Sequence, residues 1–114
     1  MTINDLKAFG ADTDDGVARC AGNEAFYIRM VAKAARDGAY DELSGALDRG
    51  DADAAFNACH KLKGFLANLS LTPILDPVIA LTEKLRPRVP LDSRPHELDE
   101  IMKKRGELLA LLEK

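Results

Sequence analysis

The residues best suited to chemistry in this chain lie together in the segment Cys59-His60-Lys61-Leu62-Lys63-Gly64. An exposed histidine ring is partly neutral near pH 7, so His60 can act as a nucleophile. Lys63, one helical turn further on, can offset the negative charge that a phosphoryl group would bring to that ring. Gly64 costs a helix about 1 kcal/mol relative to alanine, which indicates close approach of another molecule. Together these residue types predict a reversible phosphoryl acceptor.

The segment belongs to a helix predicted over residues 52–69. Its apolar side chains recur at helical spacing and define a core face, formed by Ala55, Cys59, Leu62, Leu66 and Leu69. His60 lies about 140° around the helix from the centre of that face. The same side carries neighbours at helical spacing, Phe56, Lys63, Gly64 and Ala67. We therefore expect His60 at the centre of an exposed patch.

The patch lacks the companions of an autonomous enzyme. No acid, second histidine or serine stands beside His60 on the helical wheel. The chain also has no glycine-rich loop that could cradle a nucleotide phosphate. The sequence therefore predicts a phosphocarrier that is not an enzyme, has no kinase activity of its own and holds no cofactor or metal.

The elements that position this patch are helices separated by glycine, proline and capping residues. Asn23 and Asp51 are predicted N-caps, and Asp76 is the predicted N-cap of a helix with Pro77 at its first position. The predicted helices cover residues 3–9, 12–20, 24–37, 40–49, 52–69, 77–85 and 95–113. We expect one all-α domain over 1–114, with an N-terminal helical segment (1–22) before an antiparallel four-helix bundle (23–113).

Composition narrows the class of protein further. Hydrophobic residues make up 46% of the chain and aromatic residues only 5%, so the core is aliphatic and helical. A net charge of -3 argues against a nucleic-acid-binding surface. The two cysteines, Cys20 and Cys59, have no metal or redox spacing and are expected to be reduced. With no apolar stretch of roughly 20 residues and no signal peptide, we expect a cytoplasmic monomer without membrane contact.

The segment Ala58-Cys59-His60-Lys61-Leu62-Lys63-Gly64-Phe65-Leu66-Ala67-Asn68-Leu69 resembles the His-x-Leu-Lys-Gly motif of histidine-containing phosphotransfer (HPt) domains. Gly22-Asn23-Glu24 is similar to the start of that family's first long helix. Leu47-Asp48-Arg49-Gly50-Asp51 is similar to its turn into the helix that is phosphorylated. The pattern covers about residues 15–86, and the last helix fits by type only. HPt domains shuttle phosphoryl groups between receiver-domain aspartates in two-component phosphorelays.

The resemblance implies specific roles. His60 would be the phosphoacceptor, Lys63 would stabilise the phosphoryl charge and Gly64 would give a partner steric access. The implied partners are response-regulator receiver domains and a hybrid histidine kinase, with Mg²⁺ held by the receiver. Partner contacts are expected from Phe56, Lys61 and Ala67. The chain departs from the family pattern at three positions after the motif: Ser70, where many members have glycine, Pro73 and Pro77.

Two other classes of function stay open from the residues. The first is a helical-bundle interaction module that binds a receiver or kinase domain without being phosphorylated. The second is a metal-dependent enzyme that uses His60, His96 or Cys59 with nearby carboxylates. The Glu-x-x-His pairs that metal-binding bundles use are missing from the sequence, which disfavours this class. The Met1 start and the completed bundle favour a free-standing protein.

Overall fold

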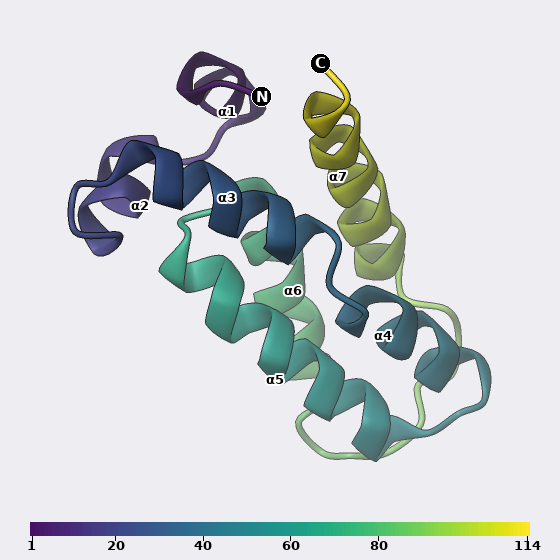
Figure 1. Cartoon of the computed structure of the whole chain (residues 1–114). Helices are drawn as coiled ribbons and strands as arrows, with labels where there is room; N and C mark the ends of the chain where they lie inside the picture. The colour runs from purple at the N-terminus through teal and green to yellow at the C-terminus, as the bar shows by residue number, and fades with distance from the viewer.

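The computed structural model describes all residues from Met1 to Lys114 and consists of helices joined by short connections, without strands (Figure 1). The predicted all-α class is confirmed. The helices are α1 (Ile3–Phe9), α2 (Thr13–Arg19), α3 (Glu24–Ala35), α4 (Ala39–Asp48), α5 (Ala52–Asn68), α6 (Thr72–Leu85) and α7 (His96–Leu112).

Helix α5 is central to the packing. It lies against α4 and α6, and α6 runs back along it before the chain turns into α7 (Figure 1). Two long-range hydrogen bonds attach α3 to this group. The Tyr27 hydroxyl donates to the Leu69 carbonyl at 2.8 Å, and Arg105 of α7 donates to the Ala35 carbonyl at 2.8 Å. The molecule is elongated, at 41 × 25 × 19 Å.

The start of α5 and its core face agree with the sequence prediction. The Asp51 carboxylate accepts a hydrogen bond from the Ala54 backbone N–H at 3.0 Å, which caps the helix. Every predicted core residue of this helix is buried: Ala55, Cys59, Leu62, Leu66 and Leu69. Burial of each leucine contributes about 2 kcal/mol, so the apolar stripe fixes which side of α5 faces outward.

Ser70, directly after α5, adopts a backbone conformation that favours glycine. Ser70 has φ +54°, in the left-handed region, and the Leu71 N–H then reaches back to the Leu66 carbonyl at 3.0 Å. The Ser70 hydroxyl donates to the Asp15 carboxylate, and the Ser70 carbonyl accepts from the Asp12 N–H at 3.1 Å. These bonds attach α2 to the end of α5, and the one from the hydroxyl requires a side chain that glycine lacks.

The predicted start of α6 at Pro77 was wrong. The helix begins at Thr72, Pro73 lies in its first turn and Pro77 lies inside it, so Asp76 is not an N-cap. Pro77 removes one backbone donor, the one that would have reached the Pro73 carbonyl. The ring of Pro77 is buried, and the helix places a continuous apolar stripe in the core, made of Ile74, Val78, Leu81 and Leu85. Burial of this stripe outweighs the single lost hydrogen bond.

Other helix ends differ from the prediction by one or two residues. Helix α3 ends at Ala35 instead of residue 37, because the Asp37 carboxylate accepts a hydrogen bond from the Ala39 N–H at 2.8 Å and the chain turns there. Gly38 consequently precedes α4 as its N-cap residue and does not terminate α3 directly. None of the helices has both the length and the apolar character needed to span a bilayer.

Candidate functional site

His60 is exposed on the outer face of α5, near the middle of the helix. The adjoining core-facing residue, Cys59, is fully buried. The packing of one side of the helix therefore turns the histidine ring to solvent. Burial raises the pKa of the Cys59 thiol to about 11, so this cysteine is an unreactive part of the core at neutral pH.

Phe56 forms the surface next to His60 on the N-terminal side. The two ring centroids lie 6.3 Å apart and the ring planes differ by 18°, so the rings are stacked. The sequence placed Phe56 on the exposed patch, but the structure shows it half-buried. The guanidinium of Arg88 also packs over the Phe56 ring, with its Cζ atom 4.3 Å from the ring centre.

Lys63 lies on the side of His60 that faces α6 and is partly buried. Its positive charge is close enough to Glu83 of α6 to lower the pKa of that carboxyl, although the hydrogen bond from Arg86 has the larger effect. Lys63 makes no ion pair within 4.0 Å. Its ammonium group therefore remains available to a charge that arises beside it.

Gly64 faces open space. A Cβ atom built on it would meet no other atom within 4 Å, whereas a Cβ on Gly16 would collide with the Tyr27 ring. Packing thus explains Gly16 but gives no reason for Gly64. Gly106 on α7 is equally open, so an open helical glycine is not unique to this site, and Gly106 is a natural internal control for it.

The three residues expected to contact a partner do not form one group. Phe56 and exposed Ala67 share the His60 side of α5. Lys61 instead points toward the turn between α3 and α4, where its ammonium lies 3.5 Å from Asp37. A shallow groove of about 110 Å³ continues from there between α3 and α5, and its lining is Met30, Lys33, Ala34, Asp37, Phe65 and Leu69.

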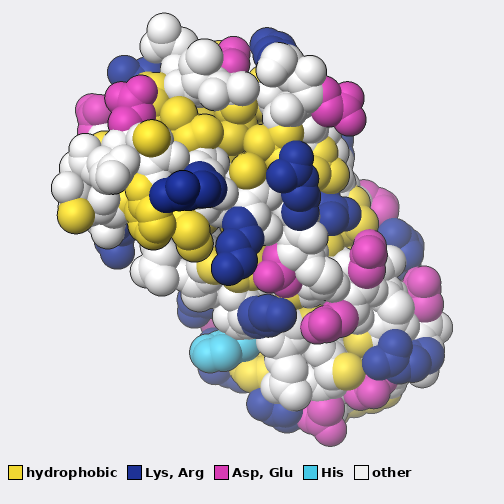
Figure 2. All heavy atoms as spheres, viewed as in Figure 1, with side chains coloured by type: hydrophobic (Ala, Val, Ile, Leu, Met, Phe, Trp, Pro, Cys, Tyr) yellow, Lys and Arg dark blue, Asp and Glu magenta, His cyan; other side chains and the backbone are white.

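The surface over α3 mixes apolar and basic side chains, as Figure 2 shows on the face that it presents. Phe26 is 39% exposed, and Arg29 lies over its ring at 5.6 Å from the centre. Met30, one turn further along, borders the groove beside α5. This combination is suited to burial against another protein, because phenylalanine, methionine and arginine are residue types enriched at protein interfaces.

Sequence reasoning missed Arg88 and Asp53. Arg88 belongs to the connection between α6 and α7, and its guanidinium donates to the Asp53 carboxylate at 3.1 Å. The prediction that no acid lies beside His60 on the helical wheel was wrong: Asp53 lies seven residues earlier on the same side of α5, and the spacing could have shown it. Arg88 could not be found in this way, because an irregular connection rich in proline has no periodicity that places its side chains.

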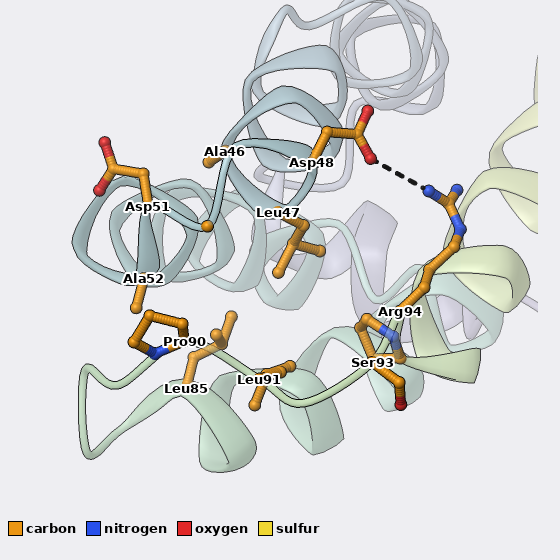
Figure 3. Close-up of a pocket in the computed structure, with 12 residues that line it drawn as sticks. Ala46, Leu47, Asp48, Asp51, Ala52, Leu85, Pro90, Leu91, Ser93 and Arg94 are labelled. Atoms are coloured by element: carbon orange, nitrogen blue, oxygen red, sulfur yellow. Dashed lines mark hydrogen bonds and ion pairs between the residues drawn. The ribbon is translucent and has the colours of Figure 1, made fainter.

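A separate cavity of about 280 Å³ lies at the N-terminal end of α5, between the α4–α5 turn and the α6–α7 connection (Figure 3). Leu47, Leu85 and Leu91 line it, and Arg94 at its edge pairs with Asp48 at 3.4 Å. It contains no histidine or cysteine. We place the candidate chemistry at His60 and not here, because the lining of this cavity includes neither an imidazole nor a thiol.

His96, the second histidine, begins α7 and has its Nδ1 atom 3.4 Å from Glu97. No cluster of three histidine, cysteine, aspartate or glutamate side chains has the geometry of a metal site.

Comparisons of the chain with protein-family models, with curated proteins and with solved structures found no match.

Proposed function

We propose that this chain is a phosphorelay intermediate of the HPt type, which accepts a phosphoryl group on His60 from a receiver-domain aspartate and passes it to another receiver. The observation that carries the proposal is the exposed His60 ring stacked on Phe56, with Lys63 one turn away and open space above Gly64. Nucleophile, counter-charge and access are thus all on one helix face.

In the proposed step, the lone pair of His60 Nε2 attacks the phosphorus of an aspartyl phosphate. A P–N bond forms as the O–P bond breaks, the aspartate leaves as a carboxylate and the imidazole loses its Nδ1 proton to solvent. The attack requires the neutral form of the ring, because only that form has a free lone pair on Nε2. Any Mg²⁺ that assists would belong to the receiver.

Docking would cover the exposed face of α5 and the adjoining side of α3. Phe56 and Ala67 would lie beneath the partner near the reacting atoms, and Phe26 and Met30 would extend the apolar contact. Lys61, held toward Asp37, would meet the partner at the edge of this surface. We propose the receiver domains of response regulators and of a hybrid histidine kinase as the partners of this monomeric, cytoplasmic carrier.

The proposed family also implies a finer description of the fold. Helices α3, α5, α6 and α7 would be the antiparallel four-helix bundle, with α1 and α2 as N-terminal additions and α4 as a further helix packed against α5. The hydrogen bonds from Tyr27 of α3 to Leu69 and from Arg105 of α7 to Ala35 support this grouping.

The test uses a panel of receiver domains phosphorylated with a small-molecule acyl phosphate. Wild-type protein should remove the phosphoryl group from at least one receiver and become labelled on His60 in an acid-labile form. His60→Gln should abolish the labelling, while His96→Gln, the matched change at the other exposed histidine, should leave it intact. Receiver binding without labelling would favour the interaction module instead.

A further inference from the structure

Arg88 is held beside the candidate site by three contacts. Its guanidinium donates to Asp53 at 3.1 Å and lies over the Phe56 ring at 4.3 Å. Its backbone has φ +58°, in the left-handed region that non-glycine residues rarely adopt. Its N–H donates to the Leu85 carbonyl at 2.9 Å, which maintains that conformation. This geometry ends α6, as it does α5 at Ser70, and the Arg88 side chain then lies against α5.

Arg88 reaches the neighbourhood of His60 through Phe56. Side chains of an α-helix lean toward its N-terminus, so the His60 ring lies over the turn that contains Phe56, as the stacked rings show. The guanidinium contacts the same phenylalanine ring. Arg88 is therefore on the N-terminal side of His60, whereas Lys63 is on the side toward the C-terminus of α5.

The pairing of Arg88 with Asp53 is weak enough to be exchanged. The Arg88 side chain is 45% exposed and that of Asp53 is 69% exposed, and ion pairs at such positions contribute at most about 1 kcal/mol. A phosphoryl group carries about -1.5 to -2 charges near neutral pH and offers three acceptor oxygens. An arginine side chain can donate two parallel hydrogen bonds to a phosphoryl group. Arg88 donates only one to Asp53, so the phosphoryl group is the stronger partner.

We propose that Arg88 binds the phosphoryl group on His60, exchanging its contact with Asp53 for the phosphoryl oxygens while the Phe56 ring supports the guanidinium. The inference rests on phosphorylation of His60 as proposed above and adds a second cation to Lys63. Asp53 holds Arg88 in place in the unmodified protein and competes with the phosphoryl group for it. Arg88 is thus a binding residue for the phosphorylated form and leaves the nucleophile unchanged.

The test requires no receiver domain, because phosphoramidate modifies exposed histidines directly. The P–N bond of phosphoramidate breaks, ammonia leaves and the phosphorus bonds to the imidazole nitrogen. Phosphorus NMR then follows the second ionisation of the phosphoryl group as the pH is raised. Phosphorylated His96 gives a reference signal in the same molecule, which the His96→Gln variant assigns.

The variants are Arg88→Gln, Asp53→Asn and the control Arg94→Gln. Arg94 is in the same connection and also pairs with carboxylates, those of Asp48 and Asp99, so its loss removes the same charge. Helical content by circular dichroism verifies that each variant folds. Arg88→Gln should raise the pKa of the phosphoryl group on His60 by about half a unit or more.

Asp53→Asn should lower that pKa, because Arg88 is then free of its competitor, and neither change should move the His96 reference. If the phosphoryl group on His60 had the same pKa in Arg88→Gln and Arg94→Gln, the proposal would be overturned. A His60 that phosphoramidate cannot modify would also overturn it. Failure of receiver transfer in the preceding experiment, with the Arg88 effect present here, would refute the relay function alone. Successful receiver transfer without an effect of Arg88→Gln on the phosphoryl pKa would refute only the role of Arg88.

Discussion

Replacement of Gly64 by alanine should make the protein more stable and poorer at phosphoryl transfer. The added Cβ meets no atom within 4 Å, so no clash opposes it and the helix gains the full difference in propensity. That difference is about 1 kcal/mol, which corresponds to a rise in Tm of about 4 °C in a domain of this size. Transfer should fall because the methyl group occupies the space through which a receiver approaches the His60 ring.

Gly106→Ala is the matched control. Gly106 is also exposed in a helix with open space around it, so it should give a similar gain in stability and no change in transfer. Gly64→Leu should reduce transfer further, because a larger side chain extends over the ring. We expect a loss of about tenfold for alanine, equivalent to about 1.4 kcal/mol, and more for leucine.

The assay combines thermal unfolding with rapid-quench transfer from a phosphorylated receiver. The reasoning would be refuted if Gly64→Leu transferred as fast as wild type, because the open face above Gly64 would then have no role in access. A destabilised Gly64→Ala protein would contradict the absence of steric neighbours. Either result can be separated from a general folding defect by comparison with Gly106→Ala.

Two further predictions concern groups outside the site. Burial raises the pKa of Glu97, but hydrogen bonds from Lys84 and from the backbone lower it more, so the pKa is below its ordinary 4.5 in the folded protein. A depressed carboxyl pKa stabilises the fold above about pH 4.5, and this stabilisation is lost as the pH falls through the folded value. Urea unfolding from pH 7 down to about pH 3 should therefore show a smaller loss of stability for Glu97→Gln than for wild type; a loss as large as the wild-type one would contradict the Lys84 pairing. Burial raises the pKa of the Cys59 thiol to about 11, so Cys59 should resist alkylation in native protein at pH 8, while half-buried Cys20 reacts first. Mass spectrometry measures the extent of alkylation at each thiol. Rapid alkylation of both thiols would contradict the burial of Cys59.

The helices could be predicted because the capping residues and the apolar spacing that form them are visible in the sequence. Asp51 caps α5 as expected, and the spacing of Ala55, Cys59, Leu62 and Leu66 predicts the buried face correctly. The exposure of His60 followed from those positions alone. Local rules were sufficient wherever the helix-forming interactions are themselves local.

The start of α6 and the surroundings of Phe56 could not be obtained in this way. Pro77 favours a helix start by local rules, but the burial of Ile74 and its apolar neighbours favours a longer helix, and that burial depends on the packing of α5. Arg88 covers Phe56 from a connection that is distant in sequence. Contacts of this kind depend on the path of an irregular segment, which periodicity does not determine.

The most direct measurement is the transfer of a radiolabelled phosphoryl group from a phosphorylated receiver domain to this protein, followed on wild type, His60→Gln and His96→Gln. We predict acid-labile label on wild type and on His96→Gln, loss of the same amount from the receiver, and none on His60→Gln. Label that persists in His60→Gln, or receivers that bind the wild-type protein and keep their phosphoryl groups, would contradict the assignment of His60 as the phosphoacceptor.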